Sequence, residues 1–256
     1  FRTSHEIQKI EVWDYDDLKK MVDMKAVEAF RARALNPEHP VLHGSAENGD
    51  IFFQHREACN RYYDALPAIV EKYMAEISKI TGREYKLFSY YGAEDAERVI
   101  ICMGSVTEAA REAIDYLNAK GEKVGMVSVH LYRPFSVKHL LAAVPKTCKR
   151  IAVLDRTKEP GANGEPLYLD VKDAFYDVEN RPLIVGGRYG LGSCDTTPTM
   201  IISVYDNLAL PEPKDHFTLG IVDDVTFHSL PLEKEMALGG EGIFEAKFYG
   251  LGADGT

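Results

Sequence analysis

The stretch that decides the fold is Arg98-Val-Ile-Ile-Cys-Met-Gly-Ser105, which continues directly into Val106-Thr-Glu-Ala-Ala-Arg-Glu-Ala-Ile-Asp-Tyr-Leu117. The apolar run from Val99 to Met103 has no polar side to turn toward water, so we expect a central strand covered on both faces. Gly104 permits a tight turn, and Ser105 with Glu108 fits a capping box that opens the following helix. The stretch therefore predicts a strand, a turn and a helix in immediate succession.

The same alternation recurs along the chain. Strands are predicted at residues 98–103, 123–132, 150–155 and 183–187, and helices at residues 106–119, 136–144, 166–176 and 198–208. Thr197 is the expected N-cap of the last helix, with Pro198 in its first position. A half-exposed edge strand is predicted at residues 85–91, and another short strand at residues 217–223. This order predicts an α/β fold of three layers, αβα, around a mostly parallel sheet.

The part of the chain before residue 82 has a mainly helical pattern. Asp14 and Asp23 are the expected N-caps of helices at residues 14–22 and 23–34. A longer helix is predicted from Asp64, and its apolar stripe should bury one face. The stripe comprises Leu66, Ile69, Val70, Tyr73, Met74, Ile77 and Ile80, and Gly82 should end the helix. Residues 39–50 are rich in turn formers and predict a surface crossing or a lid over a neighbouring domain.

Composition narrows the classes of function. The 256 residues are 45% hydrophobic and carry a formal net charge of −10, which argues against a nucleic-acid surface. No apolar run approaches the length that spans a membrane. The four cysteines are far apart, without a Cys-x-x-Cys pair, so we expect cytoplasmic thiols and neither zinc nor iron–sulfur ligands. The chain starts at Phe1 without a start signal, and we expect the native protein to continue at both ends.

Two glycine-rich turns are candidates for phosphate binding. A strand at residues 244–249 is followed by Gly250-Leu-Gly252-Ala-Asp-Gly255, which matches Gly-x-Gly-x-x-Gly in its proper context behind a strand. Its freed backbone amides could hold a phosphate. The other turn, Gly187-x-x-Gly190-x-Gly192, departs from this spacing and lies late in the sheet, so we do not predict a nucleotide site there.

The loops after the parallel strands offer an alternative function. Ligands of such sheets bind at the carboxyl ends of the strands. Arg133, Asp155, Arg156 and Arg188 lie there and could gather at a pocket for an acidic small-molecule effector in a stand-alone binding module. The charges in the loop at residues 155–164 could equally pair with one another or face a partner domain.

Eight segments in collinear order resemble the pyruvate:ferredoxin (flavodoxin) oxidoreductase family. They cover essentially the whole chain, which makes the resemblance more specific than any one motif. They are Phe1-Arg-Thr-Ser-His-Glu, Asn36-Pro-Glu-His-Pro40, Tyr85-Lys-Leu-Phe, Asp95-Ala-Glu-Arg-Val99, Leu131-Tyr-Arg-Pro-Phe135, Val153-Leu-Asp-Arg-Thr-Lys-Glu-Pro-Gly161, Gly187-Arg-Tyr-Gly-Leu-Gly-Ser193 and Phe248-Tyr-Gly-Leu-Gly-Ala-Asp-Gly-Thr256.

The resemblance implies a central part of a large multidomain enzyme, usually a homodimer. Such enzymes use thiamine diphosphate with Mg²⁺ to decarboxylate pyruvate, and they transfer the acetyl group to coenzyme A. Electrons pass through [4Fe-4S] clusters to ferredoxin or flavodoxin. By resemblance, residues 1–62 end the first, pyrimidine-binding domain. Residues 63–240 form a second domain similar to the transketolase C-terminal domain, a five-stranded sheet whose first strand is antiparallel, and residues 241–256 begin the third domain.

The resemblance also implies what this segment does not do. The sequence contains neither the Gly-Asp-Gly and Asn motif for thiamine diphosphate and Mg²⁺ nor cluster-binding cysteines. We therefore expect a structural, assembly segment with no catalytic residue and no metal ligand, inactive by itself. By resemblance, we expect coenzyme A to contact Gly250, Gly252, Ala253, Asp254 and Gly255. A large exposed apolar patch would favour this interpretation over the stand-alone module.

Overall fold

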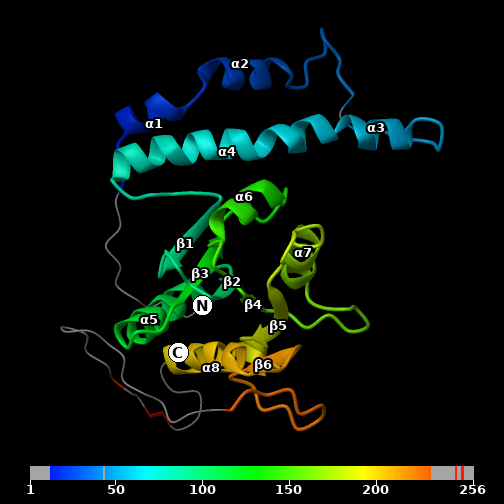
Figure 1. Ribbon diagram of the computed structural model, residues 1–256. Coiled ribbons are helices and arrows are strands. Elements are labelled where there is room, and N and C mark those ends of the chain that lie inside the picture. Colours follow the sequence, from blue (N-terminus) through cyan, green and yellow to red (C-terminus); the bar gives the residue numbers. More distant parts are fainter. Residues whose placement is uncertain (1–11, 43, 232–245, 247–248, 251–256) are drawn as a thin grey trace. The chain divides into compact units, whose positions relative to one another are not determined.

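The computed structural model describes residues 12–42, 44–231, 246, 249 and 250 (Figure 1). The chain divides into two compact units, one of residues 1–90 and 127–144 and the other of residues 91–126 and 145–256. A sheet of six strands has the order β1-β3-β2-β4-β5-β6. The strands are β1 (Phe88–Gly92), β2 (Arg98–Cys102), β3 (Val124–Val129), β4 (Arg150–Asp155), β5 (Leu183–Tyr189) and β6 (Phe217–Leu219).

The sheet is mixed and mostly parallel. Strands β2, β4, β5 and β6 are parallel, with Arg98 beside Arg150 and Arg150 beside Leu183. Strand β1 is antiparallel to β3, because the amide of Ala93 pairs with the carbonyl of Val124 at one end and the amide of His130 with that of Leu87 at the other. The α/β class and the parallel character are thus confirmed.

The sheet has six strands rather than the five that the resemblance implied. The sixth, β6, is three residues long and pairs with β5 through Gly187 and Phe217. A Cβ atom at Gly187 would lie 2.2 Å from the ring of Phe217, so this pairing depends on a glycine. The short strand predicted at residues 217–223 ends early, at Leu219.

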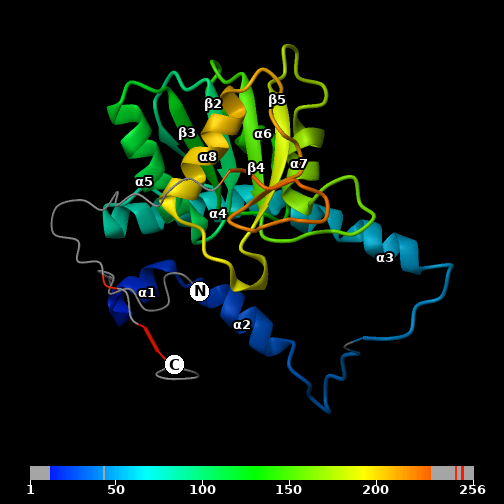
Figure 2. The same ribbon diagram turned by 90° about the horizontal axis from the view of Figure 1, so that it is seen from below.

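Helices cover both faces of the strands in the second unit. Helices α5 (Val106–Ala119) and α8 (Pro198–Ala209) pack against each other, and α8 also packs against β2 and β4. Helix α7 (Pro166–Ala174) packs against β4 and β5. Figure 2 shows α8 in front of the strands, with α7 on their other side. The prediction of three layers is confirmed within this unit.

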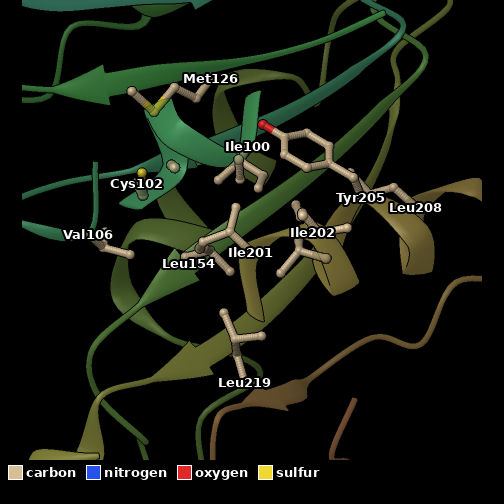
Figure 3. Packing of buried hydrophobic residues seen from close by; sticks show 14 of the residues in the cluster. Ile100, Cys102, Val106, Met126, Leu154, Ile201, Ile202, Tyr205, Leu208 and Leu219 are labelled. Atoms are coloured by element: carbon tan, nitrogen blue, oxygen red, sulfur yellow. The ribbon is translucent and has the colours of Figure 1, made fainter. Parts of the chain in front are cut away.

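The main core of this unit lies between its strands and the pair α5 and α8. Figure 3 shows Ile201, Ile202 and Tyr205 of α8 pointing toward Ile100 of β2 and Leu154 of β4. All five side chains are buried. The apolar run of β2 is therefore buried, as expected for an interior strand.

The first unit contains the helices α1 (Tyr15–Met21), α2 (Met24–Ala32), α3 (Phe52–Ala58), α4 (Asn60–Thr81) and α6 (Val137–Ala143). Asp14 and Asp23 cap α1 and α2 as predicted, each accepting two backbone amides. Gly82 ends α4 in the left-handed conformation, at φ 70°. Phe88 and Phe135 meet edge to face in this unit, with ring centroids 5.6 Å apart.

Two sequence predictions need correction. The apolar stripe of α4 is covered only in part, since none of the 22 residues of this helix is fully buried and Ile69 is 47% exposed, while Leu66, Val70, Met74, Ile77 and Ile80 are half-buried. Ser105 and Glu108 do not form a capping box, because the backbone of Ser105 is already helical (φ −64°, ψ −18°) and its hydroxyl makes no capping bond. An N-cap side chain reaches the first-turn amides from an extended backbone, which Ser105 lacks.

Candidate functional site

The carboxyl ends of β4 and β5 lie side by side in the second unit. Asp155, the last residue of β4, is 5% exposed, and its two oxygens accept hydrogen bonds from the amides of Leu167 and Tyr168, both at 3.0 Å. Asp155 thus caps α7 from a neighbouring strand and meets the positive end of that helix. Burial raises the pKa of this carboxyl, although the two backbone bonds act in the opposite direction.

Glu165 and Arg188 form a second, loosely paired contact at this end. Glu165 lies directly before α7 and is 3% exposed, and its Oε1 is 3.9 Å from Nε of Arg188. Among the described residues, Glu165 Oε2 and Arg188 Nε have no hydrogen-bond partner. A terminal nitrogen of Arg188 donates to the carbonyl of His216, so this guanidinium links β5 to the start of β6.

The turn after β5 is held by Arg156. Gly190 and Gly192 are left-handed (φ 66° and 63°) around the 3₁₀ turn η1 (Leu191–Ser193). Arg156 Nε donates to the carbonyl of Gly190 at 3.2 Å. A Cβ atom at Gly190 would lie 2.9 Å from the same nitrogen, so the guanidinium occupies the space beside this turn.

The geometry does not favour the acidic-effector pocket that the sequence left open. Asp155, Arg156 and Arg188 lie in one unit, and each bonds to backbone groups of its own fold. Arg133 belongs to the other unit, where its guanidinium lies over the ring of Tyr132, 3.9 Å from the centroid. Asp155, Arg156 and Arg188 thus hold a helix end, a turn and the start of a strand in place.

A groove of about 710 Å³ lies at the other end of β5, where that strand begins. It separates the last turns of α7 from the segment that enters β5, and both segments contribute exposed side chains. The lining residues are Lys172, Asp173, Tyr176, Arg181, Pro182, Leu183 and Ile184. The groove therefore contains none of the residues that the sequence singled out.

The predicted coenzyme A contact falls almost entirely outside the described residues. Gly250 is described and exposed, whereas Gly252, Ala253, Asp254 and Gly255 lie outside the described part of the chain. The assignment of this loop to coenzyme A stays a prediction.

The described residues do not fit a metal ion or an iron–sulfur cluster. Within residues 12–42 and 44–231, no three His, Cys, Asp or Glu side chains are grouped to hold a metal. Burial raises the pKa of Cys102 and of Cys148 to about 12, which disfavours the thiolate that a cluster needs. In the same part of the chain, no helix is both long and apolar enough to span a bilayer.

Sequence reasoning missed Glu165 and its contact with Arg188. The available signal was the position of Glu165 before Pro166, where a helix N-cap is expected and Ser, Thr, Asp or Asn is usual. The side chain of Glu165 makes no capping bond, and Asp155, ten residues earlier, caps the helix instead. No feature of the sequence near Glu165 indicates that Asp155 caps the helix in its place.

Comparisons with known proteins identify the family. Residues 96–201 match a family model described as "Pyruvate:ferredoxin oxidoreductase core domain II". Residues 1–75 match one described as "Pyruvate flavodoxin/ferredoxin oxidoreductase, thiamine diP-bdg". A solved 2-oxoglutarate:ferredoxin oxidoreductase from Magnetococcus marinus is a distant match, with TM-score 0.39 and 21% identity over 63% of this chain and 24% of that one.

Curated relatives are similar over the whole chain. It is 62% identical to the pyruvate-flavodoxin oxidoreductases of Enterobacter agglomerans and Klebsiella pneumoniae and 55% identical to the pyruvate:ferredoxin oxidoreductase of Moorella thermoacetica. In each case the match covers 100% of this chain and 22% of the relative. With both family models and this identity along its full length, the chain belongs to the pyruvate:ferredoxin (flavodoxin) oxidoreductase family.

Proposed function

We propose that this chain is an assembly segment of a thiamine-diphosphate-dependent pyruvate:ferredoxin or flavodoxin oxidoreductase. The complete enzyme oxidises pyruvate with coenzyme A to acetyl-CoA and CO₂ and passes the electrons to ferredoxin or flavodoxin. Within it, this segment positions neighbouring domains and supplies no catalytic group. The observation that carries the proposal is the uncovered apolar surface of the helices α1 to α4.

None of the residues of α1, α2, α3 or α4 is buried. Large apolar side chains on these helices nevertheless have high exposed fractions, including Phe30 at 71%, Phe53 at 65% and Tyr62 at 63%. Proteins that act alone rarely leave so many aromatic side chains of neighbouring helices in water, because each buried ring contributes apolar burial energy. This surface is typical of a segment that other parts of a larger protein cover.

The length of the relatives supports the same interpretation. This chain matches 22% of the length of each curated relative named above, so most of such an enzyme lies outside the match. The description of the model for residues 1–75 includes thiamine diphosphate binding, which supports a place beside that cofactor. We assign Mg²⁺ and the [4Fe-4S] clusters to the rest of the enzyme.

The proposal includes the finer assignments from the sequence. Residues 1–62 close the first domain, residues 63–240 form the second, and residues 241–256 begin the third. The two family models, at residues 1–75 and 96–201, support a division between the first and second domains. Coenzyme A contacts Gly250, Gly252, Ala253, Asp254 and Gly255 in the third domain. The enzyme is a cytoplasmic homodimer.

The test uses the native protein and the isolated chain side by side. An antibody raised against the 256-residue chain is used to isolate the native polypeptide, whose intact mass, iron content and pyruvate-dependent viologen reduction are measured. We expect a polypeptide several times heavier than 28.7 kDa that contains iron and reduces the dye only with pyruvate and coenzyme A. The isolated chain should reduce no dye under the same conditions.

Two outcomes would contradict the proposal. A native polypeptide of 28.7 kDa without iron would identify a stand-alone protein. Pyruvate-dependent dye reduction by the isolated chain would show that it carries catalytic groups after all.

A further inference from the structure

The loop that follows β6 presents three apolar side chains to water. It runs through residues 220–230 of the second unit and is orange in Figure 1. Val222, Val225 and Phe227 are 78%, 82% and 73% exposed. The side chains of Asp223 and Thr226, which lie between these residues, bond to each other within the loop, whereas the three apolar side chains are exposed. We call these three residues the docking tip.

The loop is rigidly built around the carboxylate of Asp223. One of its oxygens accepts the amides of Val225 and Thr226, at 3.0 and 2.9 Å. The other accepts the Thr226 hydroxyl at 2.6 Å and the amide of His228 at 2.9 Å. Four hydrogen bonds to one side chain hold the backbone of the docking tip in a single conformation, which reduces the entropy lost when a partner binds.

Further bonds fasten the loop to the sheet. The hydroxyl of Ser229 donates to the carbonyl of Ile221 at 2.8 Å and accepts the amide of Asp223 at 2.7 Å. Thr218 in β6 exchanges backbone hydrogen bonds with His228 and Leu230 at 3.0 Å. Lys214 Nζ donates to the carbonyls of Phe227 and Ser229, at 3.2 and 2.9 Å. The docking tip is therefore an extension of a sheet edge rather than a free loop.

The backbone of Phe227 is strained, and contacts within the described residues do not compensate for that strain. Its φ is +59°, a left-handed conformation that costs a bulky residue conformational energy. The ring is 73% exposed and so recovers little by burial within the described residues. Backbone strain of this kind persists where it serves a contact. A strained phenylalanine directed into water indicates that something else receives the ring.

We propose that the docking tip inserts into an apolar pocket, rimmed by basic side chains, on another domain of the same oxidoreductase polypeptide. This inference rests on the proposed function, since it takes the partner from the 78% of each relative's length that lies outside the match. The basic rim follows from charge, because the chain carries a formal net charge of −10 and the exposed Asp224 lies beside the tip.

The test places a photo-crosslinking phenylalanine analogue (benzoylphenylalanine) at position 227 of the full-length enzyme. Irradiation followed by peptide mapping should attach this residue to a peptide outside the 256-residue segment of the same polypeptide. The matched control has the analogue at Tyr176, an aromatic residue of the same unit with 71% exposure. The control should not yield that crosslinked peptide.

A substitution tests whether the ring of Phe227 stabilises the contact with the other domain. Phe227→Asn removes the ring and suits a left-handed backbone, so the isolated chain should keep its fold and melt at no lower a temperature than the parent. In the full-length enzyme the same change should speed proteolytic release of this segment by about tenfold or more, as expected when a central apolar anchor is lost. The control Tyr176→Asn should leave the release rate within about twofold of the parent.

Other results would distinguish a failure of the docking assignment from a failure of the proposed function. Crosslinks only to ferredoxin or flavodoxin, only between two copies of residues 1–256, or to no protein would each overturn the docking assignment while leaving the proposed function intact. A native polypeptide of 28.7 kDa would instead remove the proposed function itself. An unchanged proteolysis rate in the full-length Phe227→Asn variant would also overturn the inference.

Discussion

The hydroxyl of Tyr205 on α8 donates a 2.9 Å hydrogen bond to the carbonyl oxygen of Gly125 on β3. Tyr205 is fully buried, and the bond joins residues that are 80 positions apart in the sequence. It provides a buried backbone carbonyl with a donor at the place where α8 covers the strands. The hydroxyl of Tyr205 thus lies within a cluster of buried hydrophobic residues with its hydrogen bond satisfied, as is usual for buried polar groups.

Tyr205→Phe should lower the free energy of unfolding by about 1–2 kcal/mol. The ring and its packing remain, but the carbonyl of Gly125 stays buried and loses this donor. Urea denaturation of the isolated chain measures the loss. The control Tyr176→Phe, at a residue that is 71% exposed, should change stability by less than about 0.5 kcal/mol. Equal values for the two variants would show that the Tyr205 bond contributes nothing.

Gly187→Ala should lower the free energy of unfolding by about 1–3 kcal/mol, because overpacked cores must shift to make room. The new Cβ atom would lie 2.2 Å from the ring of Phe217 and 3.0 Å from Leu154. Separation of β6 from β5 should accompany the loss and should appear as faster amide exchange at Leu219. The control Gly49→Ala adds a methyl group where nothing lies within 4 Å. A neutral Gly187→Ala variant would show that β6 is not held at this glycine.

Asp155 should make stability depend on pH in the direction opposite to that of a salt-bridged acid. Burial raises its folded pKa above the reference value of 3.8, so the folded state binds the proton more tightly than the unfolded state. Its contribution is therefore greatest below pH 3.8 and declines as the pH rises through the folded pKa. The stability difference between the parent chain and Asp155→Ala should shrink over this window, as measured by denaturation at several pH values. A difference that grows with pH would contradict this assignment.

Asp223 should show the opposite dependence. The hydrogen bonds from the hydroxyl and amide of Thr226 and from the amides of His228 and Val225 lower its folded pKa below 3.8. The ionised carboxylate of Asp223 therefore stabilises the loop fully above pH 3.8. This stabilisation is lost as the pH falls through the folded pKa. Amide exchange at Val225, Thr226 and His228 should be slow near neutral pH and faster, after correction for intrinsic rates, in Asp223→Ala. Protection that survives this substitution would mean that other bonds order the loop.

Phe227→Asn should raise the stability of the isolated chain by about 1 kcal/mol, which is the order of the left-handed penalty for a residue with a bulky side chain. The carbonyl that accepts from Lys214 belongs to the backbone, so that bond remains. Thermal unfolding measures the gain. As the control, Val225→Asn changes a neighbour of similar exposure and should bring no such gain. A loss of stability in Phe227→Asn would show that the ring packs within this chain.

Local patterns predicted the positions of the elements well. Helix α5 spans Val106–Ala119 and strand β4 spans Arg150–Asp155, each with the predicted ends. Asp14 and Asp23 cap their helices as expected, because an N-cap bond joins residues two or three positions apart. Such contacts depend only on residues close together in the sequence. The apolar run that makes β2 an interior strand is likewise a local feature.

Contacts between distant residues were not predictable in the same way. The stripe of α4 indicates an apolar face but not what covers it, and within the described residues no residue of that helix is buried. Likewise, Asp155 was singled out as a candidate for effector binding, whereas its carboxylate caps α7, twelve residues onward. A charged residue after a strand is compatible with either role, and only the folded arrangement distinguishes them.

The sequence by itself determined the family, the α/β class and, apart from α3, the order of helices and strands, because these follow from collinear motifs and from short-range periodicity. Only the tertiary structure decided that a sixth strand joins the sheet, that Asp155, Arg156 and Arg188 hold the fold together, and that the docking tip is directed into water. The physical reason is that burial and hydrogen-bond partners depend on residues brought together by folding, often many positions apart in the chain.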